Sequence, residues 1–182
     1  MPSVFKYNGN EIIDSSGKVT TSAFPAGTVL KTAFTPNHTP VYNNSFSIGT
    51  EIELMSADAF TTTGSNKVLI HIEGYVGLSN NIGFILKRGT TVTGSTTAST
   101  GTYVHEDFFF GSDNHFYSAS NDIYSMLGFS YTHLDSPGAG THTYKLFCRS
   151  IGATGEIIWN RASYAADYGV GVPSFTLMEI KA

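Results

Sequence analysis

Hydrophobic and polar residues alternate along most of this chain with the two-residue period of a β-strand. Val68, Ile70 and Ile72 share one face of such a segment, while His71 and Glu73 share the other. The same alternation recurs in residues 82–87 and 123–131. No segment carries a sustained helical repeat, so the pattern predicts an all-β protein.

The C-terminal third holds the clearest strand patterns. Residues 122–134 and 141–150 are predicted to be two long strands, which the turn-rich loop 135–140 joins as in a hairpin. Further strands are expected at 157–161 and 175–180. Counted after the N-terminal segment, about eight to ten strands are expected. Many short strands with turns roughly every ten residues are typical of sandwiches, jelly rolls and barrels.

The N-terminal segment, residues 1–27, consists of short apolar pieces separated by turn residues. Such a segment cannot bury its own side chains, so we expect an arm that lies on the body of the chain or on a neighbouring protein. Residues 28–182 have a suitable length for a single β domain. The arm residues expected to make the attachment are Val4, Phe5, Tyr7, Ile12 and Ile13.

Sparse charge limits what the surface can bind. Only 13% of the 182 residues are charged, against 41% that are hydrophobic, and the net charge is −4. Proteins that bind phosphate backbones need clustered Lys and Arg, which this sequence lacks, so nucleic-acid binding is not expected. No basic leader and no apolar run near the ~18 residues of a membrane helix is present, so we expect a soluble protein outside membranes. Low charge also suits surfaces that meet other subunits.

Two residues that occur once each have simple interpretations. Cys148 is the only cysteine, which excludes a disulfide within the chain, and its alternation with Tyr144 and Leu146 predicts a small buried hydrophobe. Trp159 is the only tryptophan and lies in a predicted strand with little alternation. A strand that is apolar on both faces is buried on both. Trp159 is therefore expected either in the core or between two subunits.

The best candidate for a binding site is the aromatic segment 103–117. Its polar groups, set among six aromatic rings, are His105, Glu106, Asp107, Asp113 and His115. Their spacing has no metal-site register, so metal binding, recognition of a receptor or subunit, and an ordinary strand with its loop all stay open. Flat aromatic rings give recognition surfaces a large contact area. The rings expected to contact a receptor are Tyr103, Phe108, Phe109, Phe110 and Tyr117.

A second candidate is the histidine pair His133 and His142, which flanks the predicted hairpin loop together with Asp135. If the strands pair symmetrically, the two imidazoles lie opposite one another. Two imidazoles and a carboxylate suit zinc or copper. The same two rings would also suit simple packing across the strands, or a switch that titrates between about pH 5 and 7.

Catalytic arrangements are not found in the sequence. There is no nucleophile elbow, no Ser/His/Asp set in strand context and no carboxylate pair in a cleft. The glycine-containing loop at 138–140 lacks the Lys and Thr/Ser of a phosphate-binding loop. We therefore expect neither an enzyme nor a cofactor.

The strand and turn patterns resemble those of small all-β virion proteins of tailed bacteriophages, marine and cyanobacterial phages in particular. The segments that carry the resemblance are 8–17, 84–89, 130–138, 143–147, 159–161 and 175–180. They cover strands and turns over much of the chain and include no catalytic signature. The chain departs from fibre proteins in having no collagen-like or coiled-coil shaft, which favours a compact attachment.

The resemblance implies an antiparallel jelly roll like that of tumour-necrosis-factor-like domains, assembled as a homotrimer. The implied function is non-enzymatic: a capsid decoration or cement protein, assembled in the host bacterial cytoplasm, that binds a major capsid protein or a neck or tail protein. The alternative is the receptor-binding head of a tail or head fibre that recognises a host surface glycan. The residues expected at the subunit interface are Tyr131, Tyr144, Phe147 and Trp159.

Overall fold

The computed structural model describes residues 5–7, 10–14, 16, 18–20, 23–79, 82–89, 102–103, 127–150, 154–160 and 171–182. The strands in these ranges all pair antiparallel, and no α-helix is found among them. The predicted all-β class is therefore confirmed. This part of the chain holds no helix with the length and hydropathy needed to cross a bilayer.

The larger sheet is built around the long strand β7. Its members are β3 (Val29–Pro36), β4 (Val41–Phe46), β7 (Lys67–Ser79), β10 (Leu127–Asp135), β13 (Gly155–Trp159) and β14 (Ser174–Ile180). The strand order is β3-β14-β7-β13-β4, and β10 also pairs with β7. Because β7 has 13 residues, it reaches all three of β14, β10 and β13.

The second sheet has the order β5-β12-β8-β9. Its bounds are β5 (Glu51–Ser56), β8 (Ile82–Arg88), β9 (Thr102–Tyr103) and β12 (Tyr144–Ser150). A small ladder of β6 (Phe60–Thr62) with β11 (Gly140–His142) lies at one end. The described residues thus hold twelve strands from β3 to β14, and the short β6, β9 and β11 explain why more are found there than expected.

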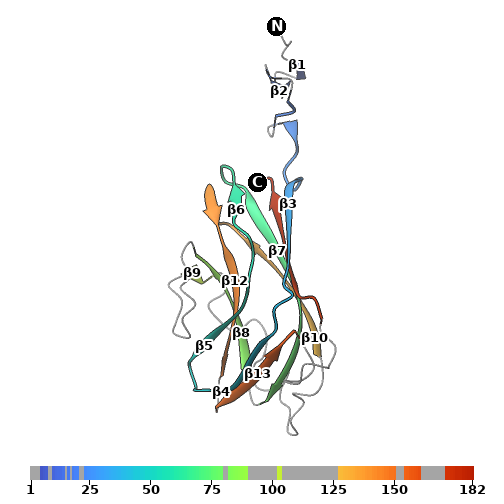
Figure 1. The fold of residues 1–182 in the computed structure, drawn as a ribbon. Helices are drawn as coiled ribbons and strands as arrows, with labels where there is room; N and C mark the ends of the chain where they lie inside the picture. The colour runs from blue at the N-terminus through green and yellow to red at the C-terminus, as the bar shows by residue number, and fades with distance from the viewer. Residues whose placement is uncertain are drawn as a thin grey trace.

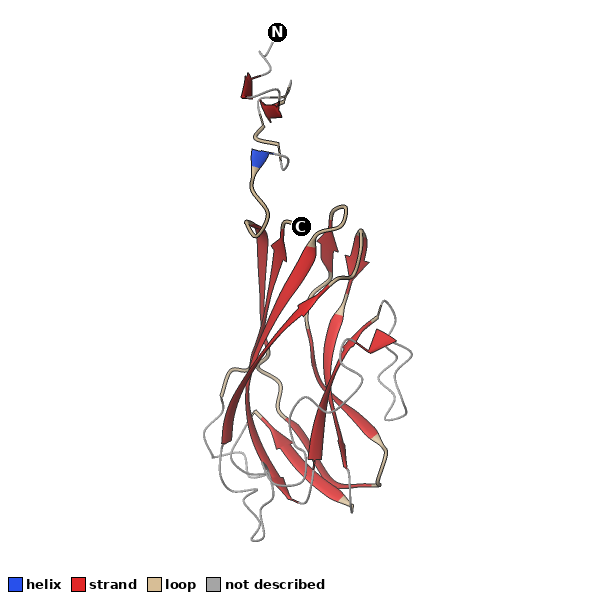
Figure 2. Cartoon of the chain, turned by 180° about the vertical axis from the view of Figure 1, so that it is seen from behind, coloured by secondary structure: helices blue, strands red, loops and turns tan. Residues whose placement is uncertain are grey.

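The two sheets face each other as two layers across a single core (Figures 1 and 2). Val68, Ile70 and Ile72 of β7 are fully buried and belong to the same hydrophobic cluster as Phe84 and Leu86 of β8. The alternation predicted for β7 is confirmed. Cys148 also lies in this cluster, as predicted, and burial raises the pKa of its thiol.

Strand β8 differs from the expected alternation because both of its faces are buried. Phe84 and Leu86 face the core, and Ile85 and Lys87 on the other face are only 2% and 1% exposed. Lys87 is neutralised there by an ion pair with Glu51 of β5. A buried charge needs such a partner, which the sequence pattern alone did not identify.

The predicted hairpin between residues 122–134 and 141–150 is wrong. Strand β10 pairs with β7 in the larger sheet, whereas β12 pairs with β5 and β8 in the other. The turn-rich loop after Asp135 therefore crosses from one layer to the other. Alternation specifies which face of a strand is buried, but it does not specify the neighbouring strand.

The N-terminal segment forms its own small hairpin of β1 (Phe5–Tyr7) and β2 (Asn10–Ile13), extended by a bridge from Ile13 to Val19. Figures 1 and 2 both show this hairpin beyond the end of the two layers, on the side where the C-terminus lies. The hairpin itself therefore does not pack on the two layers, whereas Phe24 and Gly27 at the end of the arm hydrogen-bond Lys181 of the body. Attachment of the arm to a neighbouring protein stays a prediction.

Candidate functional site

An apolar patch lies on part of the outer face of the larger sheet. We call it the outer patch and define it as Val29, Phe34, Leu69, Leu134, Met178 and Ile180. The strand register brings these residues together, since Leu69 lies opposite both Met178 and Leu134, and Ile180 lies opposite Val29.

The apolar side chains of the outer patch are unusually exposed to solvent for a chain without a partner. Phe34 is 61% exposed, Val29 48% and Leu134 47%, while Leu69 and Met178 are half-buried. Scattered exposed apolar residues are common on proteins, but contiguous apolar patches mark sites of interaction. The outer patch is therefore a candidate interface.

Strand β14 contributes to this patch because it carries apolar residues on both faces toward its end. Phe175 and Leu177 point into the core and are buried, while Met178 and Ile180 point outward. A strand with this composition is typical of one that is covered on both sides. Sequence reasoning missed the outer patch, and the doubly apolar pattern of residues 174–180 was the available signal.

The arm joins the body next to this patch. Gly27 N donates a hydrogen bond to Lys181 O at 2.8 Å, and Lys181 N donates to Thr28 O at 2.9 Å. Val29 begins β3 directly after this junction, and Ile180 ends β14 beside it. The arm and the outer patch thus emerge at the same end of the molecule.

The turn of the arm is ordered by Asp14. Its Oδ1 accepts hydrogen bonds from the Ser16 hydroxyl, from Ser16 N at 2.8 Å and from Lys18 N at 3.0 Å. These hydrogen bonds lower the pKa of the Asp14 carboxyl group, and the bond from the Ser16 hydroxyl has the largest effect. Ile12 and Ile13 are half-buried, and Val19 is 55% exposed. A hairpin this small has no core of its own, so its apolar side chains are available to a partner.

The attachment residues expected in the arm are described unevenly. Ile12 and Ile13 lie in β2, and Phe5 and Tyr7 lie in β1. Val4 lies outside the described residues.

The symmetric strand pairing that would have placed His133 opposite His142 does not form. His133 lies on β10 and stacks on Tyr131 with a ring-centroid distance of 6.3 Å, whereas His142 on β11 hydrogen-bonds Gly138 O through Nε2 at 3.2 Å. Across the described ranges, no three His, Cys, Asp or Glu side chains are grouped so that they could hold a metal ion. The two histidines separate because the loop between them crosses between sheets.

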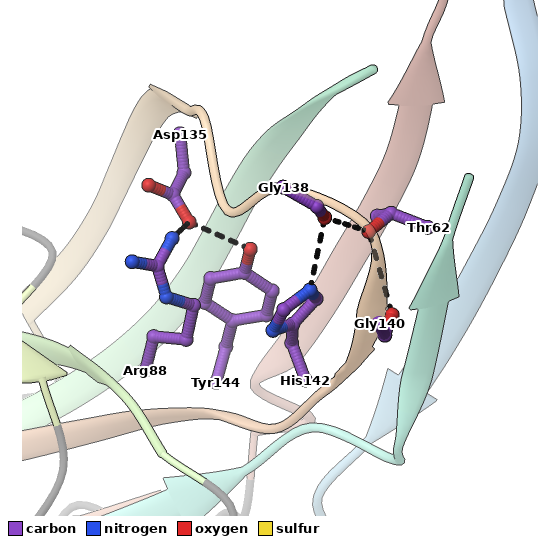
Figure 3. A network of polar contacts seen from close by, with 7 residues as sticks. All are labelled: Thr62, Arg88, Asp135, Gly138, Gly140, His142 and Tyr144. Atoms are coloured by element: carbon purple, nitrogen blue, oxygen red, sulfur yellow. Dashed lines mark hydrogen bonds and ion pairs between the residues drawn. The ribbon is translucent and has the colours of Figure 1, made fainter. Parts of the chain in front are cut away.

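A polar network takes the place of that site (Figure 3). Asp135 Oδ2 accepts hydrogen bonds from Arg88 Nη1 at 2.5 Å and from the Tyr144 hydroxyl at 2.8 Å. Burial, followed by the hydrogen bond to Asp135, raises the pKa of Tyr144 and keeps the phenol protonated as a donor. The carboxylate that was one candidate ligand among the open alternatives instead connects the end of β10 to β8 and β12.

The interface residues expected from the sequence are mostly internal. Tyr144 and Trp159 are fully buried and Phe147 is 1% exposed within the chain itself, so their side chains leave no surface for a second subunit. Of the two positions predicted for Trp159, the structure shows the core. Tyr131 is partly buried against that core, and burial raises the pKa of its phenol.

The aromatic segment 103–117 falls mostly outside the described residues. Tyr103 lies in the short strand β9, paired with Lys87 of β8. Phe108, Phe109, Phe110 and Tyr117 lie outside the described ranges, as do His105, Glu106, Asp107, Asp113 and His115. Metal binding and recognition by this segment therefore stay predictions.

No protein-family model matches the sequence, and a comparison with curated proteins finds no similar protein.

Proposed function

We propose that this protein is a non-enzymatic structural protein that attaches through its N-terminal arm and assembles with copies of itself through the outer patch. The observation that carries the proposal is that an arm without a core and an exposed apolar sheet face lie together at one end of the molecule. Both features need a partner to cover them.

We further infer a jelly-roll topology. Eight of the strands, taken in chain order, are β3, β5, β7, β8, β9, β10, β12 and β14. The first, eighth, third and sixth adjoin in one sheet, and the second, seventh, fourth and fifth adjoin in the other. This wrapped order is that of two interleaved Greek keys, and it supports the jelly roll that the resemblance to virion proteins implies.

The proposed particle is a bacteriophage virion, with the protein as a homotrimeric decoration or cement protein. This part of the proposal is supported by the resemblance of the strand and turn patterns and by the compact body without a shaft. The arm would bind a major capsid protein or a neck or tail protein. A stable contact of this kind buries about 800 Å² on each partner.

The association state of the purified protein tests the role of the outer patch. We expect sedimentation velocity to give a trimer for the natural protein and a monomer for the double variant Phe34→Asp with Leu134→Asp, because charges would be placed at two exposed patch positions. Ile48→Asp is the matched control, since Ile48 is 60% exposed but lies outside the patch. A monomeric natural protein, or a double variant that remains trimeric, would contradict the proposal.

The heat stability of assembled phage particles tests the proposed role in the virion. Phage particles assembled without this protein should release their DNA at a lower temperature than complete particles, because the contacts that bridge neighbouring subunits are missing. Particles that are equally stable with and without the protein would argue against a cement role. The alternative function, glycan recognition by a fibre head, was expected in segment 103–117 and stays a proposal.

A further inference from the structure

A pocket on the outer face of the larger sheet carries the chemistry of a sugar-binding site. It has a volume of about 320 Å³ and is lined by Glu73, Gly74, Tyr75, Gly128 and Ser130. It lies farther along β7 than the outer patch, away from the arm. This volume is at the lower end of small-ligand pockets, which span about 300–1,000 Å³, and is suited to one small ring.

The ring of Tyr75 lies between two glycines. On one side Gly128 lies directly opposite in β10, and a Cβ there would stand 3.8 Å from the ring. On the other side a Cβ at Gly171 would stand only 2.3 Å from ring atom Cδ2. The ring therefore occupies space that a side chain at position 171 would fill, while 39% of the residue stays exposed.

One buried asparagine, Asn160, hydrogen-bonds the backbone of both Tyr75 and Gly171. Asn160 N donates a hydrogen bond to Tyr75 O at 2.9 Å, and Gly171 N donates to Asn160 O at 3.2 Å. Asn160 is fully buried, and its side-chain Nδ2 donates to Asn37 O at 3.1 Å. Its φ of 70° lies in the left-handed region, which asparagine tolerates better than most residues. The aromatic surface of the pocket is thus preorganised.

The carboxylate of the pocket is oriented as well. His71 Nε2 donates a hydrogen bond to Glu73 Oε1 at 3.3 Å, and His71 Nδ1 hydrogen-bonds Thr132 Oγ1 at 2.9 Å. Ser130 lies directly opposite Glu73 in the ladder of β7 and β10. Opposed residues place their Cβ atoms about 5 Å apart, so a carboxylate and a hydroxyl stand side by side.

We propose that this pocket binds a single neutral pyranose ring. The C–H face of the sugar would lie on the exposed face of Tyr75, because an aromatic ring offers a rigid apolar surface at little entropic cost. Neighbouring sugar hydroxyls would donate to Glu73 and exchange hydrogen bonds with Ser130, since a carboxylate only accepts. Acidic sugars would be repelled by Glu73. The inference does not depend on the protein being part of a virus particle.

Ligand-observed saturation-transfer NMR on the full-length protein tests this site. The probes are the methyl glycosides of glucose, galactose and mannose, together with N-acetylglucosamine, N-acetylneuraminic acid and choline. We expect at least one of the four neutral sugars to bind with a millimolar dissociation constant and N-acetylneuraminic acid not to bind. No transfer to any neutral sugar, or binding of choline alone, would overturn the proposal in favour of an empty pocket or a cation site.

Substitutions in the pocket test whether the sugar binds there. Tyr75→Ala and Glu73→Gln should each weaken the best sugar about tenfold, the loss expected when an aromatic contact or a charged hydrogen-bond acceptor is removed. Tyr42→Ala is the matched control, since Tyr42 is 40% exposed and also lies near a glutamate, Glu156, at 3.4 Å. Glu73 is well exposed, so Glu73→Gln keeps the test decisive if Tyr75→Ala misfolds. Unchanged affinity in Glu73→Gln would refute the site.

Discussion

The carboxylate of Asp135 accepts a hydrogen bond from the hydroxyl of Tyr144 at 2.8 Å, and the two residues belong to different sheets. Asp135 ends β10, and Tyr144 begins β12. Arg88, at the end of β8, adds a second donor to the same carboxylate oxygen. The loop that crosses between the layers is therefore fixed at both ends by one side chain.

We predict that Tyr144→Phe lowers the free energy of unfolding by about 1–2 kcal/mol, because a hydrogen bond to a charged acceptor is lost. Asp135→Ala should cost more, about 2–3 kcal/mol, since it leaves both Arg88 and the buried Tyr144 hydroxyl without this acceptor. Urea unfolding followed by circular dichroism measures both. The control is Tyr42→Phe, whose exposed hydroxyl is 3.4 Å from Glu156 and should matter little. Equal losses in Tyr144→Phe and Tyr42→Phe would contradict this account.

The ion pair between Lys87 and Glu51 gives a second prediction. The two side chains are 1% and 2% exposed, and the Lys87 ammonium lies 5.0 Å from the centre of the Phe147 ring. Lys87→Met should cost about 3 kcal/mol or more, because Glu51 would stay buried without its closest cation. Adding Glu51→Leu should restore much of that loss, since the buried charge is then gone as well.

A double-mutant cycle in denaturant measures this coupling. The comparison is the neighbouring pair of Lys145 and Glu53, whose N···O distance is 3.0 Å and whose side chains are 11% and 26% exposed. Water reaches this pair, so its coupling should be about 1 kcal/mol or less. The prediction fails if the two pairs show the same coupling energy.

The sequence predicted the strand faces well and the strand partners poorly. Alternation placed Val68, Ile70 and Ile72 in the core because burial depends on which face a side chain occupies, and that is a local property. Whether β10 pairs with β7 or with β12 depends on the path of the loop between them, and the turn residues at Pro137 and Gly138 suit a hairpin and a crossover equally.

The candidate site was predicted less completely than the strand faces, for a related reason. Aromatic residues such as Trp159 and Phe147 suggested an interface by their type, yet both are buried in the protomer. The outer patch and the Tyr75 pocket depend on register between strands that are distant in sequence. Leu69 and Leu134 meet across β7 and β10, which only the pairing reveals.

Acid should lower the stability of the folded protein, because it protonates the Glu179 carboxylate near the C-terminus. Burial on its own would raise the pKa of this carboxyl group, but three hydrogen bonds to Oε1, from Thr63 N, Thr63 Oγ1 and Asn66 Nδ2, each at 2.8 Å, lower it below the usual 4.5. A lowered pKa in the folded state means that this stabilisation is present above pH 4.5 and is lost as pH falls through the folded pKa.

We therefore expect the difference in unfolding free energy between the natural protein and Glu179→Gln to shrink between about pH 6 and pH 3. Thermal or urea unfolding at several pH values measures it. Glu156→Gln is the control, because that carboxylate is partly exposed and its hydrogen bond from the Tyr42 hydroxyl is long, at 3.4 Å. A constant difference across the pH range would show that the hydrogen bonds do not depend on the charge of Glu179.

Removing residues 1–22 should separate attachment from folding. The β1–β2 hairpin lies beyond the two layers, and the backbone bonds that tie the arm to the body begin at Gly27. We expect the truncated protein to unfold at the same denaturant concentration as the full chain, since no core side chain is lost, while its binding to the particle disappears. Co-sedimentation with particles that lack the protein measures the binding, and the full chain is the reference. Truncation that lowers stability by several kcal/mol, or that leaves binding intact, would show that the arm serves the fold and not the contact.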